Sequence, residues 1–90
     1  MAQFRDNEDA LRYERPEAGG LIFADYEEAG NLRRILYVET PPALRGKGLA
    51  ALLMQDIVAH ARANALKLKP ICPYAVAYAK RHRDDADVFV

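Results

Sequence analysis

Polar turns divide the first forty residues into short runs of strand-forming residues. Leu11 and Tyr13 alternate with charged residues after the polar segment 6–9, and the apolar Phe4 stands before that segment. Alternation of this kind is typical of a strand with one buried face. The pattern therefore predicts a β-hairpin, which the Pro- and Gly-rich segment 16–20 brings to an end.

Two further runs continue the strand pattern. Residues 21–26 are rich in strand formers, and residues 27–31 contain the turn-forming pair Gly-Asn, after which the apolar pattern resumes over residues 32–39. We expect an antiparallel meander in which the last strand has two distinct faces. One face is Leu32, Arg34, Leu36 and Val38, and the other is Arg33, Ile35, Tyr37 and Glu39.

The period of the pattern changes to that of a helix after residue 48. An apolar stripe at spacings of three and four residues predicts a helix that ends near Asn64 and packs on the sheet. A strand over 66–71 would complete a right-handed crossover and run parallel to the strand before the helix, with Pro70 limiting it to a short or edge strand. The stripe comprises Leu49, Leu52, Leu53, Ile57 and Ala61, widened by Ala50, Met54 and Val58.

The C-terminal residues predict a second helix. Pro73 suits the first position of a helix, and residues 74 to about 83 continue in helical composition. The last residues, 84–90, either close with a short strand or fray. Strands followed by a crossover and a final helix correspond to an α+β fold, an α/β sandwich, and we expect one domain over residues 1–90.

The stretch from Thr40 to Ala50 joins the last meander strand to the long helix. Pro41 and Pro42 end the strand, and the two glycines, Gly46 and Gly48, permit turn geometry and close approach of a ligand to the backbone. The loop amides then become the unpaired N–H groups of a helix N-terminus, which attract phosphate. The sequence therefore predicts an anion-binding loop.

Composition narrows the classes of partner. The 90 residues contain 13 basic and 13 acidic residues, for a net charge of zero, which argues against a general nucleic-acid binder. One cysteine excludes an internal disulfide, and the first residues lack the features of a signal peptide, so we expect a cytoplasmic protein. No apolar run approaches the ~18 residues of a membrane span, and no Cys/His/Asp spacing suggests a metal site.

The loop residues Arg45-Gly46-Lys47-Gly48-Leu49-Ala50 resemble the Arg/Gln-x-x-Gly-x-Gly/Ala signature of the GNAT superfamily, the acetyl-CoA-dependent N-acyltransferases. With Lys-Pro-Ile-Cys-Pro-Tyr and Tyr-Ala-Lys-Arg-His further on, the chain is similar to the small single-domain members over nearly its whole length. The resemblance implies a GNAT-like acyl-CoA N-acyltransferase fold. It also implies acetyl-CoA as co-substrate and an amine acceptor that the sequence does not identify.

The resemblance also implies a division of roles for binding. The backbone amides of Gly46, Lys47, Gly48, Leu49 and Ala50 would hold the pyrophosphate of coenzyme A. The side chains of Arg45 and Lys47 would add positive charge, unless they are solvated charges beside a turn. Backbone groups of residues 36–39, Val38 among them, would contact the pantetheine arm.

Three side chains are candidates for the chemistry. Cys72 precedes the second helix, where the helix dipole favours a thiolate, although most unpaired cysteines are buried small hydrophobes. Tyr78 resembles the tyrosine with which many GNAT members protonate the thiolate, although it or Tyr74 could simply pack. Glu39 is the candidate base, with a solvent-facing carboxylate as the alternative.

One departure from the small relatives bears on activity. Many of them carry His-Thr-Glu-Val before the Pro-Pro pair, where this chain has Tyr37-Val38-Glu39-Thr40. A tyrosine near its reference pKa of ~10 is a poor base at neutral pH. His60 lies toward the far end of the long helix and His82 in a basic helix end, so neither replaces the missing histidine.

Three functions therefore remain open from sequence. They are an N-acetyltransferase, a non-catalytic acyl-CoA binding or sensing module, and a structural domain that has lost the ligand. Exposed sheet edges also leave a homodimer open.

Overall fold

The computed structural model describes residues 4–90, and within them a five-stranded sheet carries two α-helices. The strands lie in chain order, with β1 to β4 antiparallel and β5 parallel to β4. The predicted meander, crossover and final helix, and with them the α+β fold, are confirmed. The elements are β1 (Arg5–Asn7), β2 (Arg12–Glu17), β3 (Gly20–Ala29), β4 (Leu32–Glu39), α1 (Leu49–Ala63), β5 (Lys67–Pro70) and α2 (Pro73–Arg81), with 3-10 turns at Glu8–Ala10, Pro42–Leu44 and Arg83–Asp85.

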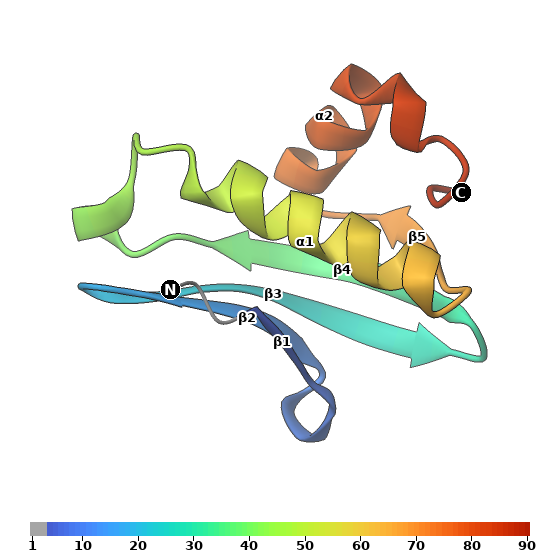
Figure 1. Ribbon diagram of the computed structural model, residues 1–90, viewed down its shortest axis with the longest axis horizontal. Helices are drawn as coiled ribbons and strands as arrows, with labels where there is room; N and C mark the ends of the chain where they lie inside the picture. The colour runs from blue at the N-terminus through green and yellow to red at the C-terminus, as the bar shows by residue number, and fades with distance from the viewer. Residues whose placement is uncertain (1–3) are drawn as a thin grey trace.

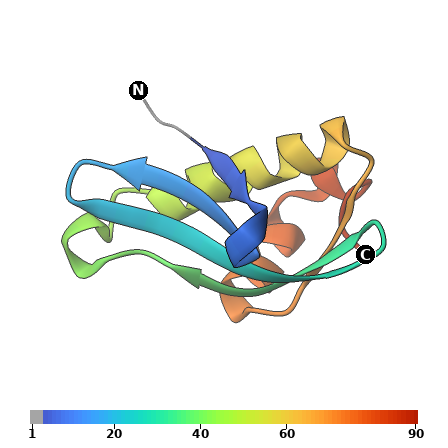
Figure 2. The same ribbon diagram turned by 90° about the horizontal axis from the view of Figure 1, so that it is seen from below.

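Both helices lie on one side of the sheet (Figures 1 and 2). Helix α1 contacts β2, β3 and β5, whereas α2 contacts β4 and β5 and also touches α1. Burying the apolar face of α1 against the strands forms the core. The most enclosed α1 residues are Leu53, Met54, Ile57 and Ala61, each without exposed surface. Leu52, predicted within the stripe, is 37% exposed, because the buried face is centred on the Met54 side of α1.

The ends of β3 and α2 differ from the prediction. β3 continues to Ala29, so residues 27–29, predicted as turn, pair with β4 instead, and only Gly30 and Asn31 separate the two strands. Helix α2 ends at Arg81 rather than near residue 83. The tail makes a single parallel bridge from Phe89 to Leu68 at the outer edge of β5.

A β-bulge in β4 changes which side chains share a face. Asp25 pairs with Tyr37, but the next residue of β3 pairs with Ile35, so Leu36 is the extra residue of β4. The strict alternation predicted for residues 32–39 is therefore wrong beyond Leu36. Tyr37 lies on the same face as Phe23, with ring centroids 6.3 Å apart, on the side of the sheet away from α1.

A buried polar cluster fastens the first hairpin to the start of β4. The guanidinium of Arg33, whose residue is 4% exposed, donates to Asp6 at 2.5 Å and to the Tyr13 hydroxyl at 2.9 Å. The Tyr26 hydroxyl donates to Asp6 at 2.6 Å, and Arg33 also donates to Glu28 at 2.8 Å. This Arg33 cluster lies at the opposite end of β4 from the loop that follows Glu39.

Candidate functional site

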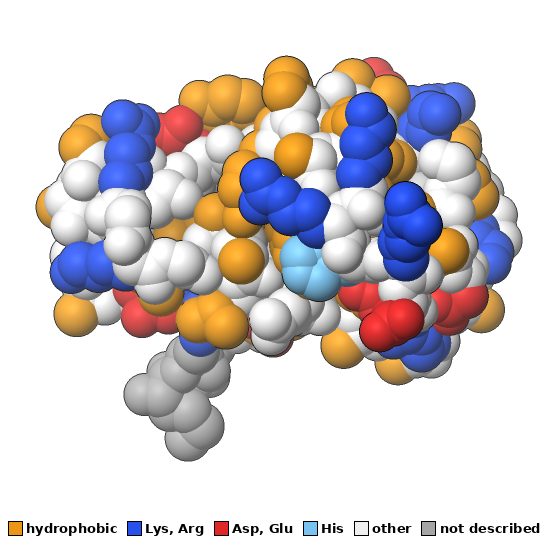
Figure 3. Space-filling view, turned by 90° about the horizontal axis from the view of Figure 1, so that it is seen from above, with side chains coloured by type: hydrophobic (Ala, Val, Ile, Leu, Met, Phe, Trp, Pro, Cys, Tyr) orange, Lys and Arg blue, Asp and Glu red, His pale blue; other side chains and the backbone are white. Residues whose placement is uncertain are grey.

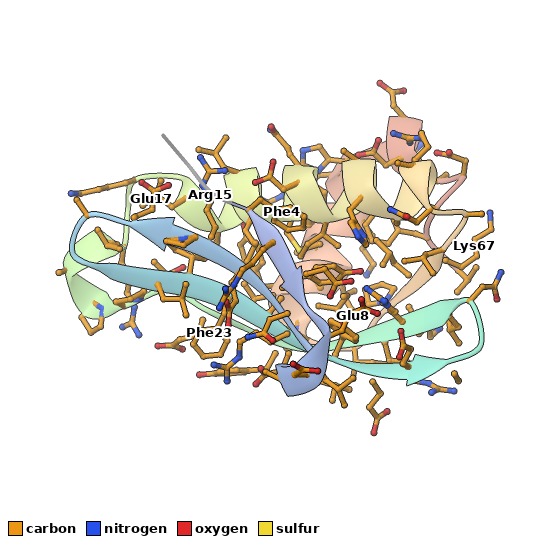
Figure 4. All side chains as sticks on the ribbon, turned by 60° about the horizontal axis from the view of Figure 1, so that its bottom comes forward. Phe4, Glu8, Arg15, Glu17, Phe23 and Lys67 are labelled. Carbon is orange, nitrogen blue, oxygen red and sulfur yellow. The ribbon has the colours of Figure 1, made fainter. Side chains whose placement is uncertain are left out.

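The loop between β4 and α1 forms one end of the molecule. Figure 4 shows Glu17 at this end of the sheet and Lys67 at the other. Figure 3, which looks onto the helices, shows Lys and Arg side chains projecting at its left end, where the loop lies. The loop is anchored by Leu44, which is 5% exposed and whose amide donates to the Pro41 carbonyl at 2.9 Å.

Two glycines give the loop its shape. Gly46 has φ +79° and Gly48 has φ +73°, a left-handed conformation in which a side chain is strained. Gly48 is also the N-cap of α1, and its carbonyl accepts the Leu52 amide at 3.3 Å. A Cβ at either glycine would meet no atom within 4 Å, so the space above the loop is open.

The loop and the first turn of α1 present free backbone donors. Within residues 4–90, the amides of residues 46–51 have no backbone carbonyl partner. The first turn of α1 carries no acidic side chain to offset the positive end of the helix dipole. This arrangement can bind an anion, as the loop sequence predicts.

A depression of about 200 Å³ lies over these donors. One wall comes from α2, where Tyr74 is 38% exposed and burial raises the pKa of its hydroxyl. The sequence singled out Tyr78 rather than Tyr74, and Tyr78 does not line the depression. The depression is lined by Thr40, Leu44, Arg45, Gly46, Gly48, Leu49, Ala50 and Tyr74.

Strands β4 and β5 separate next to the loop. Their pairing ends at Ile35 and Pro70, and the Ile35 carbonyl accepts the amides of both Ile71 and Cys72, at 3.0 and 3.1 Å. Within the described residues, β4 beyond Ile35 pairs with β3 alone. Backbone groups on the β5 side of residues 36–39 are consequently available to an extended ligand.

Glu39 ends β4 beside the loop, and both of its carboxylate oxygens have partners. The Tyr37 hydroxyl donates to Oε1 at 2.5 Å, and the Arg45 guanidinium lies 3.4 Å from Oε2. The hydrogen bond to Glu39 raises the pKa of Tyr37, so this tyrosine stays a donor at neutral pH. Arg45 also donates from Nε to the Thr40 carbonyl at 3.0 Å.

The other candidate side chains lie away from the depression. Cys72 is 7% exposed and is the N-cap of α2, close to where β5 leaves β4. Tyr78 is 4% exposed, and its ring stacks on that of His82 with the centroids 3.7 Å apart, so His82 is partly buried rather than part of a solvated helix end. His60 lies 3.7 Å from Asp6, in the Arg33 cluster.

Sequence reasoning missed the partners of Glu39 and the wall formed by Tyr74. The bulge, which places Tyr37 and Glu39 on the side of the sheet away from α1, has no clear signal in a run of alternating residues. Tyr74 could have been found, because it immediately follows the Pro73 that starts α2. Among residues 4–90, no group of three His, Cys, Asp or Glu side chains could hold a metal ion.

An α+β sheet whose fourth strand leads into a glycine loop at a helix N-terminus defines the N-acyltransferase class of fold. The family model described as GCN5-related N-acetyl-transferase matches residues 12–88. The chain therefore belongs to the GCN5-related N-acetyltransferase family, which confirms the resemblance found in residues 45–50. Membership supports a general acetyltransferase role.

The fold has a solved counterpart. The chain is similar to a GCN5-like protein from Staphylococcus aureus whose structure was determined by NMR, with a TM-score of 0.75 and 23% sequence identity. The match covers 98% of this chain and 87% of that one, and at this identity it establishes the fold alone. A comparison with curated proteins found no match. None of the helices within residues 4–90 is long and apolar enough to cross a membrane.

Proposed function

We propose that the protein transfers an acetyl group from acetyl-CoA to an amine. The observation that carries the proposal is the set of free amides over residues 46–51, at a helix N-terminus without acidic side chains. A pyrophosphate carries charge and acceptor oxygens of the kind these donors satisfy. Gly46 to Ala50 would hold it, with the Arg45 and Lys47 side chains as supplementary cations.

The acyl arm would run along β4 beyond Ile35. The early end of β4–β5 pairing supports this path, because it leaves the backbone around Val38 free on the β5 side. An arm on this path would bring the thioester toward Glu39, at the end of β4, and toward Cys72, which follows β5 on the other side of the gap between the two strands. The chain thus offers a carboxylate and a thiol for the two proton transfers.

The proposed reaction forms a bond between the amine nitrogen and the acetyl carbonyl carbon, and breaks the carbon–sulfur bond. Glu39 accepts one proton from the acceptor ammonium, which makes the nitrogen nucleophilic. The departing thiolate takes a proton from Cys72, and Cys72 regains one from the nitrogen when the intermediate collapses. Tyr78 is the weaker candidate for this acid because its ring packs against His82.

Titration calorimetry with acetyl-CoA tests the binding step. Gly48→Val should abolish binding, because it strains a backbone with φ +73° and places a side chain over the free amides. Gly30→Val is the matched control, since Gly30 also has positive φ (+61°) and open space but lies in the β3–β4 turn. Absence of heat with the unaltered protein, or equal affinity in both variants, would refute the proposal.

A second candidate function is acyl-CoA binding without turnover. It is favoured by the burial of Cys72 and by the engagement of both Glu39 oxygens. It predicts that the protein binds acetyl-CoA but releases no free thiol with any amine of a broad panel. Thiol release that depends on both an amine and Glu39 would exclude it.

A further inference from the structure

Arg45 lies between the anion-binding loop and Glu39, the candidate base. Arg45 is one of the residues that line the depression over the free amides, and its guanidinium reaches Glu39 at 3.4 Å and the Thr40 carbonyl at 3.0 Å. One side chain therefore belongs both to the anion-binding loop and to the candidate base. The two roles compete, because a guanidinium that turns toward an anion over the loop must leave Glu39.

The contact to Glu39 is the weaker of these alternatives. The Arg45 side chain is 61% exposed, and a solvated ion pair at 3.4 Å contributes little free energy. A pyrophosphate instead offers several oxygens to the planar guanidinium, next to backbone donors that already fix the anion. An anion on the loop is therefore the stronger partner for Arg45.

Resting on the proposed function, we propose that Arg45 is a positioning residue that exchanges partners when acyl-CoA binds. Without the donor, Arg45 occupies Oε2 of Glu39 while Tyr37 occupies Oε1. With the donor bound, Arg45 contacts the pyrophosphate and Oε2 becomes free to accept the proton of an acceptor ammonium. Donor binding thus makes the base available.

The exchange of partners predicts that loss of the Glu39 charge changes the affinity for coenzyme A. If Glu39 competes for Arg45, removing the Glu39 charge leaves Arg45 free for the donor and strengthens coenzyme A binding. An exposed ion pair of this kind corresponds to about a two- to fivefold gain in affinity. The gain requires Arg45 and should vanish when Arg45 is replaced.

The experiment is a double-mutant cycle measured by calorimetry with coenzyme A. The four proteins are the unaltered chain, Glu39→Gln, Arg45→Gln and the double variant, each checked for folding by circular dichroism and thermal unfolding. We expect Glu39→Gln to tighten binding about two- to fivefold alone and to have no effect in the Arg45→Gln background. An equal gain in both backgrounds would mean that Glu39 merely repels the anion, and no gain would mean that the two do not compete; either result overturns the inference.

A second measurement follows Arg45 itself. Its side-chain Nε–Hε NMR signal, assigned by its absence in Arg45→Gln, should shift when coenzyme A saturates the unaltered protein. A signal that stays in place while coenzyme A binds also overturns the partner exchange. If the unaltered protein does not bind coenzyme A, the proposed function is overturned as well. If it binds coenzyme A but the effects of Glu39→Gln and Arg45→Gln on affinity are additive, the proposed function stands and only the partner exchange is overturned.

Discussion

Replacement of Arg33 by methionine should destabilise the fold without affecting the site. Arg33→Met keeps a long side chain at a position that is 4% exposed, but removes the donors to Asp6, Glu28 and the Tyr13 hydroxyl. The Glu28 side chain is 39% exposed and can be solvated again, whereas that of Asp6 is only 10% exposed. Asp6 is then left as a nearly buried charge without its cation.

The size of the effect follows from that uncompensated charge. Removing one partner of a buried pair costs about 3–5 kcal/mol. The total stability of a chain of 90 residues is about 5–13 kcal/mol, at roughly 0.05–0.15 kcal/mol per residue. Arg33→Met should therefore remove between about a quarter and all of the free energy of unfolding. Adding Asp6→Asn should recover part of it, because an amide oxygen still accepts the Tyr26 hydroxyl.

Urea unfolding followed by circular dichroism measures this loss. Arg34→Met is the matched control on the same strand, since the Arg34 side chain is 41% exposed and only 4.0 Å from Glu27, and it should change stability by less than about 0.5 kcal/mol. Where Arg33→Met stays folded, its coenzyme A affinity should equal that of the unaltered chain. A loss below about 1 kcal/mol, or an equal loss in Arg34→Met, would refute the assignment of the Arg33 cluster as a buried clamp.

Three further outcomes are expected. Burial raises the pKa of Tyr13 to about 12, so the folded state favours the protonated hydroxyl. The stability that this preference contributes is complete below the reference pKa of ~10 and is lost as pH rises toward 12. In urea unfolding between about pH 9 and 11, Tyr13→Phe should therefore lose less stability with rising pH than the unaltered chain. Tyr74→Ala should weaken coenzyme A binding several-fold because it removes a wall of the depression, whereas Tyr78→Phe should not; equal affinities by calorimetry would contradict this. Cys72→Ala should lower turnover by about 100-fold or more at unchanged coenzyme A affinity if the thiol protonates the leaving group, and unchanged thiol release would exclude that role.

Much of the fold could be predicted because local patterns determine it. Turn residues and alternation located the meander, and Pro41 and Pro42 ended β4 within a residue of the predicted position. The apolar stripe predicted α1 to within a residue at its ends. Leu52 was misplaced because a wide stripe does not reveal which of its edges faces the sheet.

The site could be predicted only where it depends on backbone geometry. Gly46 and Gly48 adopt positive φ beside free amides, as residues without a Cβ suggest. Tyr37 and Glu39 were predicted on one face, but two features could not be predicted: the bulge at Leu36 that turns this face away from α1, and the Arg45 side chain that folds back from the loop to Glu39. The Arg33 cluster was missed for a related reason, since its members come from four separate segments of the chain.

The bulge at Leu36 has a consequence for how β4 tolerates substitution. Before it, the odd-numbered Arg33 and Ile35 face the core; after it, the even-numbered Val38 packs on the core and Tyr37 faces outward. A scan along β4 should therefore find substitutions damaging at Arg33 and Ile35 in the first half and at Val38 in the second. The single extra residue in β4 thus places its odd-numbered positions in the core before the bulge and on the outer face, beside the proposed site, after it.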